Sequence, residues 1–127
     1  MILIRYHILM KLLVTLFLFS TIILEAVNYD ALLLNGNCTT CHSKSEPASA
    51  PSLQEIKNYY LKAHPSKNDF ISAMSTWVKT PTLKGALMDE AIEKYGLMPE
   101  LAFDIETLKS IASYIYEEDF LSVKKDN

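Results

Sequence analysis

Residues 36–44 read GNCTTCHSK and contain the only two cysteines of the chain, Cys38 and Cys41, with His42 directly after the second. Cysteines three positions apart occur in disulfides, in zinc sites, in redox-active dithiols and at the attachment sites of larger cofactors. The sequence on both sides of this stretch decides between these alternatives, and with them the fold.

The segments around the stretch have helical periodicity. Ser66 with Asp69 resembles a capping box, Thr82 is expected to cap the next helix, and Asp104 the last one. No convincing strand alternation occurs, so the fold class is predicted to be all-α, with about five short helices joined by proline-containing loops. The expected helices run from Tyr29 to Leu34, from Leu53 to near Pro65, from Ser66 through Val78, from Thr82 to Tyr95 with Gly96 just beyond, and from Asp104 through Tyr116.

Three of the alternatives fit such a chain poorly. A thioredoxin-like dithiol belongs to a strand–helix–strand unit, and no strand is predicted. A structural zinc site needs four ligands, and outside the N-terminal segment only the two cysteines, His42 and His64 are available, with the histidines far from their usual separation. A disulfide between Cys38 and Cys41 closes too small a loop to stabilise much, and it leaves His42 unexplained.

The remaining alternative accounts for all three residues, because C-x-x-C-H is the attachment sequence for c-type haem. Within one helical turn Cys38 and Cys41 project from the same side, so both sulfurs can form thioethers with one porphyrin edge. His42 is rotated by about 100° from Cys41 in such a turn, so its imidazole can reach the iron. We therefore predict one covalently bound haem c.

The N-terminal segment predicts export. Residues 12–24 read LLVTLFLFSTIIL and carry no charge, which is the length of a signal-peptide core and short of the roughly 20 residues that span a bilayer. Residues 1–26 are predicted to be a signal peptide cleaved after Ala26. The alternative is an uncleaved anchor from Ile8 to Leu24, with Lys11 reaching the membrane surface. The predicted location is the periplasm, with a membrane tether if the leader is retained.

Residues 27–127 are about the size of one small domain. The formal charge of the whole chain is −3, and it becomes −4 when Arg5, Lys11 and Glu25 leave with the leader. A mildly acidic domain argues against nucleic acid and against a polybasic membrane patch. So short a chain has limited surface to bury and is often supported by a disulfide, a metal or a cofactor.

Together these features resemble the class I, monohaem c-type cytochromes, over about residues 28–120. The resemblance rests on a short helix before CTTCH, the stretch APSL at 50–53, the stretch GLMPEL at 96–101 and the closing helix ETLKSIASYIY at 106–116. It implies a cytochrome c fold in which the helices wrap around the haem. It also implies that Met98, in a loop between Gly96 and Pro99, is the second axial ligand opposite His42.

Other residues compete with Met98 for that role. Met74 and Met88 lie inside predicted helices, where methionine usually fills the core. His64, before Pro65, is the rival that would make a bis-histidine site.

The resemblance assigns further residues. The Pro51 carbonyl is expected to accept a hydrogen bond from the free ring N–H of His42, with Pro47 as the alternative. Trp77 is expected either to donate its indole N–H to a haem propionate or to pack in the core. Asp30 stands where a glycine is common and Leu34 where an aromatic is common, so Leu34 is expected to pack near Ile111 and Tyr114.

A haem iron held by His42 and Met98 has no open position, so the expected function is one-electron transfer between respiratory redox partners. Lys44, Lys79 and Lys84 are the candidates for docking an acidic partner at the haem edge. The alternatives are a haem c domain of a redox enzyme complex, and a gas- or peroxide-reactive haem protein with a labile sixth ligand. A peroxide-reactive pocket would need a distal acid–base pair, and the chain has no arginine after the leader.

Overall fold

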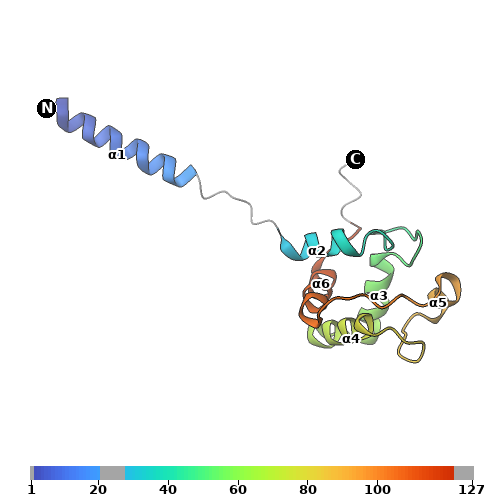
Figure 1. Cartoon of the computed structure of the whole chain (residues 1–127). Helices are drawn as coiled ribbons and strands as arrows, with labels where there is room; N and C mark the ends of the chain where they lie inside the picture. Colours follow the sequence, from blue (N-terminus) through green and yellow to red (C-terminus); the bar gives the residue numbers. More distant parts are fainter. Residues whose placement is uncertain (1, 21–27, 122–127) are drawn as a thin grey trace.

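The computed structural model describes residues 2–20 and 28–121, and over these residues helices are the only regular secondary structure (Figure 1). The all-α prediction is confirmed. The helices are α1 (Ile2–Ser20), α2 (Tyr29–Asn37), α3 (Leu53–Ala63), α4 (Lys67–Lys79), α5 (Asp89–Tyr95) and α6 (Ile105–Glu117). Five of them, α2 to α6, follow the N-terminal segment, as expected.

Helix α1 presents apolar side chains around its circumference. Leu3, Tyr6, Leu9 and Leu13 are all more than half exposed, and α1 packs against none of the other described helices. Within the described residues, no helix combines the length and the apolar character needed to cross a membrane. The predicted cleavage after Ala26 and the start of the domain at residue 27 lie outside the described residues.

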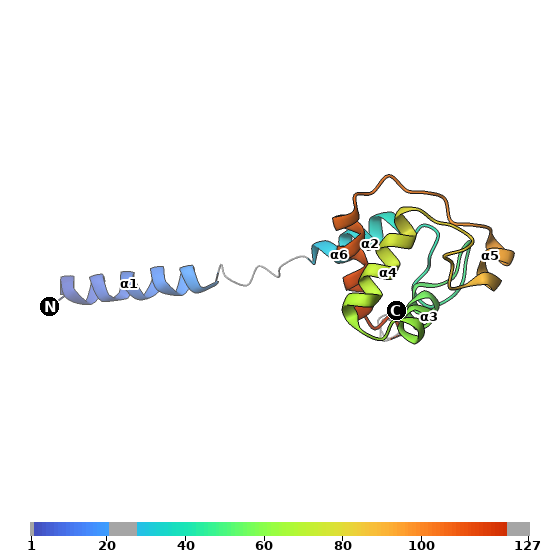
Figure 2. The ribbon, with the colours of Figure 1, turned by 90° about the horizontal axis from the view of Figure 1, so that it is seen from below.

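The core lies where α2, α3 and α4 pack against α6, an amphipathic helix of 13 residues that lies beside α4 (Figure 2). Leu34 of α2 is 1% exposed and belongs to the same cluster as Ile111, with Tyr114 packed against it. The expected packing of Leu34 is therefore confirmed. Phe70 of α4 is fully buried between Tyr60 and Tyr116, with ring centroids 5.7 and 5.2 Å away.

Side-chain caps determine where most helices begin. The oxygens of Asn28, Ser52, Ser66 and Asp104 accept hydrogen bonds from backbone N–H groups in the first turns of α2, α3, α4 and α6. Ser66 also donates to the Asp69 carboxylate at 2.6 Å, so the predicted pairing of these two residues is present. These caps place the starts of the four helices where the sequence predicted them. Helix α2 continues to Asn37, past its predicted end at Leu34.

The predicted start of the fourth helix at Thr82 is wrong. Helix α5 begins at Asp89, after Met88, and Thr82 lies in a loop. The Thr82 hydroxyl accepts from Gly85 N–H at 3.3 Å, and the Thr82 carbonyl accepts from the Trp77 indole at 3.1 Å. Thr82 therefore stabilises a turn against α4 instead of capping a helix.

Candidate functional site

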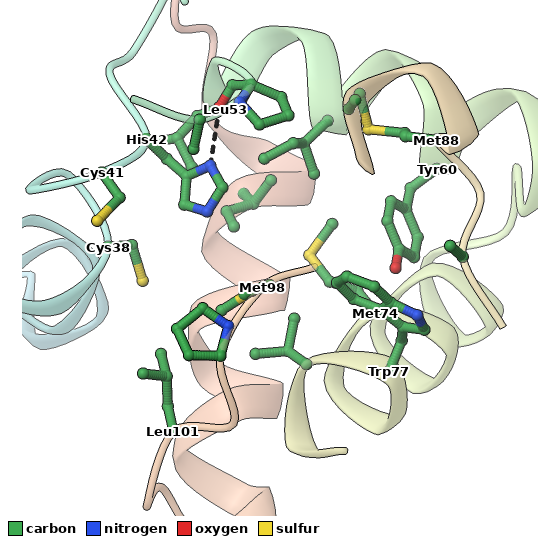
Figure 3. Close-up of a pocket in the computed structure, with 18 of the residues that line it drawn as sticks. Cys38, Cys41, His42, Leu53, Tyr60, Met74, Trp77, Met88, Met98 and Leu101 are labelled. Atoms are coloured by element: carbon green, nitrogen blue, oxygen red, sulfur yellow. Dashed lines mark hydrogen bonds between the residues drawn. The ribbon is translucent and has the colours of Figure 1, made fainter. Parts of the chain in front are cut away.

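An apolar cavity of about 280 Å³ opens between the CTTCH turn, α3, α4, α5 and α6 (Figure 3). Most of its walls are aliphatic or aromatic. They include Leu53, Ile56, Tyr60, Val78, Ile92, Leu101, Phe103, Leu108, Ile111 and Ile115. A cavity of this kind, with a few convergent polar groups, is the usual form of a binding site for a small molecule or cofactor.

Both cysteines and His42 line this cavity from a single turn. The turn follows α2 directly, and in it the N–H of His42 donates to the carbonyl of Cys38 at 2.9 Å. Both thiols are free, and Cys38 is half-buried, which raises the pKa of its thiol. Figure 3 shows the two sulfurs on the same side of the pocket, next to the His42 ring. The turn therefore presents two nucleophilic sulfurs and one imidazole to the same space.

A hydrogen bond to the loop after the turn orients the imidazole of His42. Its Nδ1 lies 2.8 Å from the carbonyl oxygen of Pro51, at hydrogen-bond distance (Figure 3). With Nδ1–H donating to that oxygen, Nε2 is the nitrogen left to act as a ligand. Pro51 itself lines the cavity, whereas Pro47 does not. The structure thus brings together the two residues that the sequence paired.

Met98 reaches the cavity from a different part of the chain. It lies on the segment between α5 and α6, after Gly96, whose φ of 85° is the left-handed conformation that glycine adopts most readily. That conformation lets the chain leave α5 and pass over the pocket. Figure 3 shows Met98 beneath the His42 ring in this view, so the turn and this segment contribute to one cavity.

Two further thioethers, which the sequence assigned to packing, line the same cavity. Met74 of α4 is 4% exposed and belongs to the core cluster, and Met88 precedes the first turn of α5. Met74 stands three and four positions before Trp77 and Val78, which also line the cavity, so helical spacing could have placed it there. Met88 was missed because the start of its helix was predicted too early.

His64 does not line the cavity. It follows the last residue of α3, and its ring centroid is 6.4 Å from that of Tyr60. His64, the alternative ligand for a bis-histidine site, therefore lies on the outer side of Tyr60, and Tyr60 itself forms part of the cavity wall.

Two aromatic residues carry polar groups at the cavity. Trp77 lines it, and its indole N–H donates to the Thr82 carbonyl; its role toward a propionate stays a prediction. Tyr60, which lies within the helix predicted to start at Leu53, is 6% exposed, and burial raises its pKa to about 12. Its hydroxyl is therefore neutral at any ordinary pH.

The lysines expected to dock a partner do not line the cavity. Lys79, at the end of α4, donates from Nζ to the carbonyl of Phe103 at 2.5 Å. Lys44 is half-buried and Lys84 is exposed on the loop before α5. Lys79 thus has a structural partner on the segment that carries Met98.

The donor set of the cavity fits a haem better than a bare metal ion. Within the described residues, no three side chains of histidine, cysteine, aspartate or glutamate gather to hold an ion. Two sulfurs at one edge, an imidazole with an oriented Nδ1–H and a thioether from another segment are the groups that c-type haem requires.

Comparison with known families, with curated proteins and with solved structures finds no match to the chain.

Proposed function

We propose that the chain is a class I c-type cytochrome that carries one electron at a time between redox partners in the periplasm. The observation that supports this proposal most strongly is the cavity lined by Cys38, Cys41 and His42 from one turn and by Met98 from another segment. A haem bound there would supply an iron that cycles between the ferrous and ferric states.

In this proposal each residue has a separate task. Cys38 and Cys41 would attach the haem through thioethers: each S–H adds across a vinyl C=C, so that the sulfur bonds to one vinyl carbon and the hydrogen to the other. His42 Nε2 and the Met98 sulfur would hold the iron, and the Pro51 carbonyl keeps the imidazole in one orientation. The apolar walls exclude water from the ligands, so the site changes little when the electron moves.

The axial pair determines the chemistry. A thioether favours the ferrous state, so a histidine–methionine pair raises the potential relative to a bis-histidine pair. With His42 and Met98 both bound to the iron, no ligand position would remain for oxygen or peroxide. A carrier between respiratory proteins is therefore the proposed role, either soluble after cleavage at residue 26 or tethered through residues 1–26.

The test is expression of the full chain with a cytochrome c maturation system. One haem per chain that stays bound in acidified acetone is expected, because thioethers survive that extraction. Cys38→Ala with Cys41→Ala should abolish covalent haem, whereas Thr39→Ala, in the same turn, should retain it. A haem that extracts freely from the unmodified chain, or a chain isolated with zinc, would overturn the proposal.

A further inference from the structure

The mouth of the cavity is uncharged and partly apolar. The lining residues that are exposed include Asn37, Cys41, Ser49, Leu87, Gly96, Leu97 and Pro99. Leu87 and Leu97 remain 37% and 42% exposed beside the opening. Exposed leucines at the edge of a pocket, with polar residues around them, are typical of a surface that another protein covers.

The charges beside this mouth are mostly negative. Residues 86–100, which supply most of the mouth, contain four exposed carboxylates and one ammonium group. On α5, Ala91, Ile92 and Tyr95 line the cavity, so the charged residues of the helix flank the site on its outer side. The carboxylates are Asp89, Glu90, Glu93 and Glu100, and the ammonium group is that of Lys94, 4.8 Å from the centre of the Tyr95 ring.

Lysines do not offset these carboxylates along residues 86–100, where Lys94 is the only ammonium group against four carboxylates. Like the carboxylates, Lys44, Lys79 and Lys84 do not line the cavity, and Lys79 already donates to Phe103. An acidic partner would therefore meet like charge next to the apolar mouth, which opposes association.

We infer that the apolar mouth and the carboxylates of residues 86–100 dock a redox protein whose own cofactor edge is surrounded by lysine or arginine side chains. The inference rests on the proposed function and replaces the expectation of an acidic partner. Opposite charges would steer the two proteins together, and Leu87 and Leu97 would exclude water from the small contact area. Such transient redox contacts bury little surface and exchange rapidly.

The test uses stopped-flow electron transfer with two probes of opposite charge. One electron leaves the ferrous haem of this chain and reduces either a lysine-rich ferricytochrome c or ferricyanide. The variant Glu93→Lys with Glu100→Lys is compared with the control Glu106→Lys with Glu117→Lys, which changes the net charge equally on α6, away from the mouth. Rates are measured at low and at high salt.

The rate with the basic probe at low salt should fall at least about 10-fold in the mouth variant and by less than about 3-fold in the control, and high salt should remove the difference. With ferricyanide the mouth variant should react faster. Equal effects of the two variants, or faster reaction of the mouth variant with the basic probe, would overturn the inference.

Failure of the proposed function would look different, because a chain without haem has no visible spectrum. On such a chain the docking surface is tested by titrating the ¹⁵N-labelled protein with the same basic probe. Broadening of amide signals in residues 86–100 supports a basic partner at this surface; broadening elsewhere, or none, overturns it.

Discussion

Met98 is one of three methionines around the cavity, and only Met98 comes from a segment without helical hydrogen bonds. Met74 is confined by the core on α4, whereas the segment after Gly96 carries Met98 to the cavity outside any helix. The proposed distinction between a ligand and a packing methionine therefore depends on backbone context rather than on the type of side chain.

Met98→Ala should abolish the weak red charge-transfer band of a methionine–Fe(III) bond, lower the potential and allow carbon monoxide to bind readily. Optical spectra and a redox titration measure all three. The matched controls Met74→Leu, Met88→Leu and His64→Ala should keep the band. If the band survives in Met98→Ala and disappears in Met74→Leu, α4 supplies the ligand instead.

The buried Tyr60 makes the free energy of unfolding depend on pH in the alkaline range. Its pKa is about 12 in the folded chain, against an ordinary value of 10.0, because burial disfavours the phenolate. The unfolded chain loses this proton first as the pH rises above 10, so the folded state loses stability between pH 10 and 12. Tyr60→Phe should reduce the slope of the free energy of unfolding there by up to about 1.4 kcal/mol per pH unit.

Urea denaturation followed by circular dichroism at several alkaline pH values measures that slope. Tyr59→Phe is the control, since Tyr59 is 40% exposed on the same helix and should leave the slope nearly unchanged. Tyr114, whose pKa is also raised to about 12, is expected to retain part of the slope in the Tyr60 variant. Equal slopes in the wild type and Tyr60→Phe would contradict the assignment.

At the scale of elements, the segment between α5 and α6 has few bonds to the rest of the molecule. The Lys79 ammonium group at the end of α4 donates to the Phe103 carbonyl, five residues after Met98. Phe103 N–H in turn donates to the Leu101 carbonyl at 2.9 Å, and both residues line the cavity. Lys79 therefore holds α4 to the segment that brings Met98 to the site.

Lys79→Met keeps the apolar stem and removes the bond. Loss of a charge-assisted hydrogen bond should weaken the attachment of this segment by on the order of 1 kcal/mol. The methionine–iron band should then disappear at a lower temperature than in the wild type, and the amides of residues 101–104 should exchange faster.

Lys84→Met is the control, because it removes the same charge from an exposed lysine on the neighbouring loop. The same loss of the band in both variants would mean that charge, and not the bond to Phe103, is responsible.

At the scale of the molecule, α6 holds the other helices together. It contacts α4 most extensively, then α2 and α3, while α5 covers the cavity through Ala91, Ile92 and Tyr95. Core and cavity share residues, since Met74, Ile111, Ala112 and Ile115 belong to both. Filling the cavity should therefore stabilise the packing of the whole domain.

Leu34→Ala should destabilise the domain by about 2–5 kcal/mol, because it leaves a cavity between α2 and α6 at a side chain that is 1% exposed. Leu32→Ala, on the same helix at 56% exposure, should change stability by less than about 0.5 kcal/mol. Urea denaturation of the two variants gives both values. Similar losses in the two would show that α2 is not packed through Leu34.

Local features of the chain were sufficient for the helices and for the turn from Cys38 to His42. Caps such as Ser66 and Asp104 act within three or four residues, and the two cysteines and His42 occupy one turn, so spacing alone determines how they are presented. The pairing of His42 with Pro51 came from family resemblance and joins residues nine positions apart. Most predictions confined to a few neighbouring residues therefore agree with the structure, the predicted cap at Thr82 excepted.

Contacts between distant residues depended on the packed structure. The sequence could not show that Met88 and Tyr60 share the cavity with Met98, nor that Lys79 donates to Phe103, 24 residues away. The sequence also predicted the start of a helix at Thr82. Local capping patterns do not reveal that the Trp77 indole N–H donates a hydrogen bond to the Thr82 carbonyl. Such choices are made by burial and by competition between distant hydrogen-bonding groups, which only the assembled helices bring together.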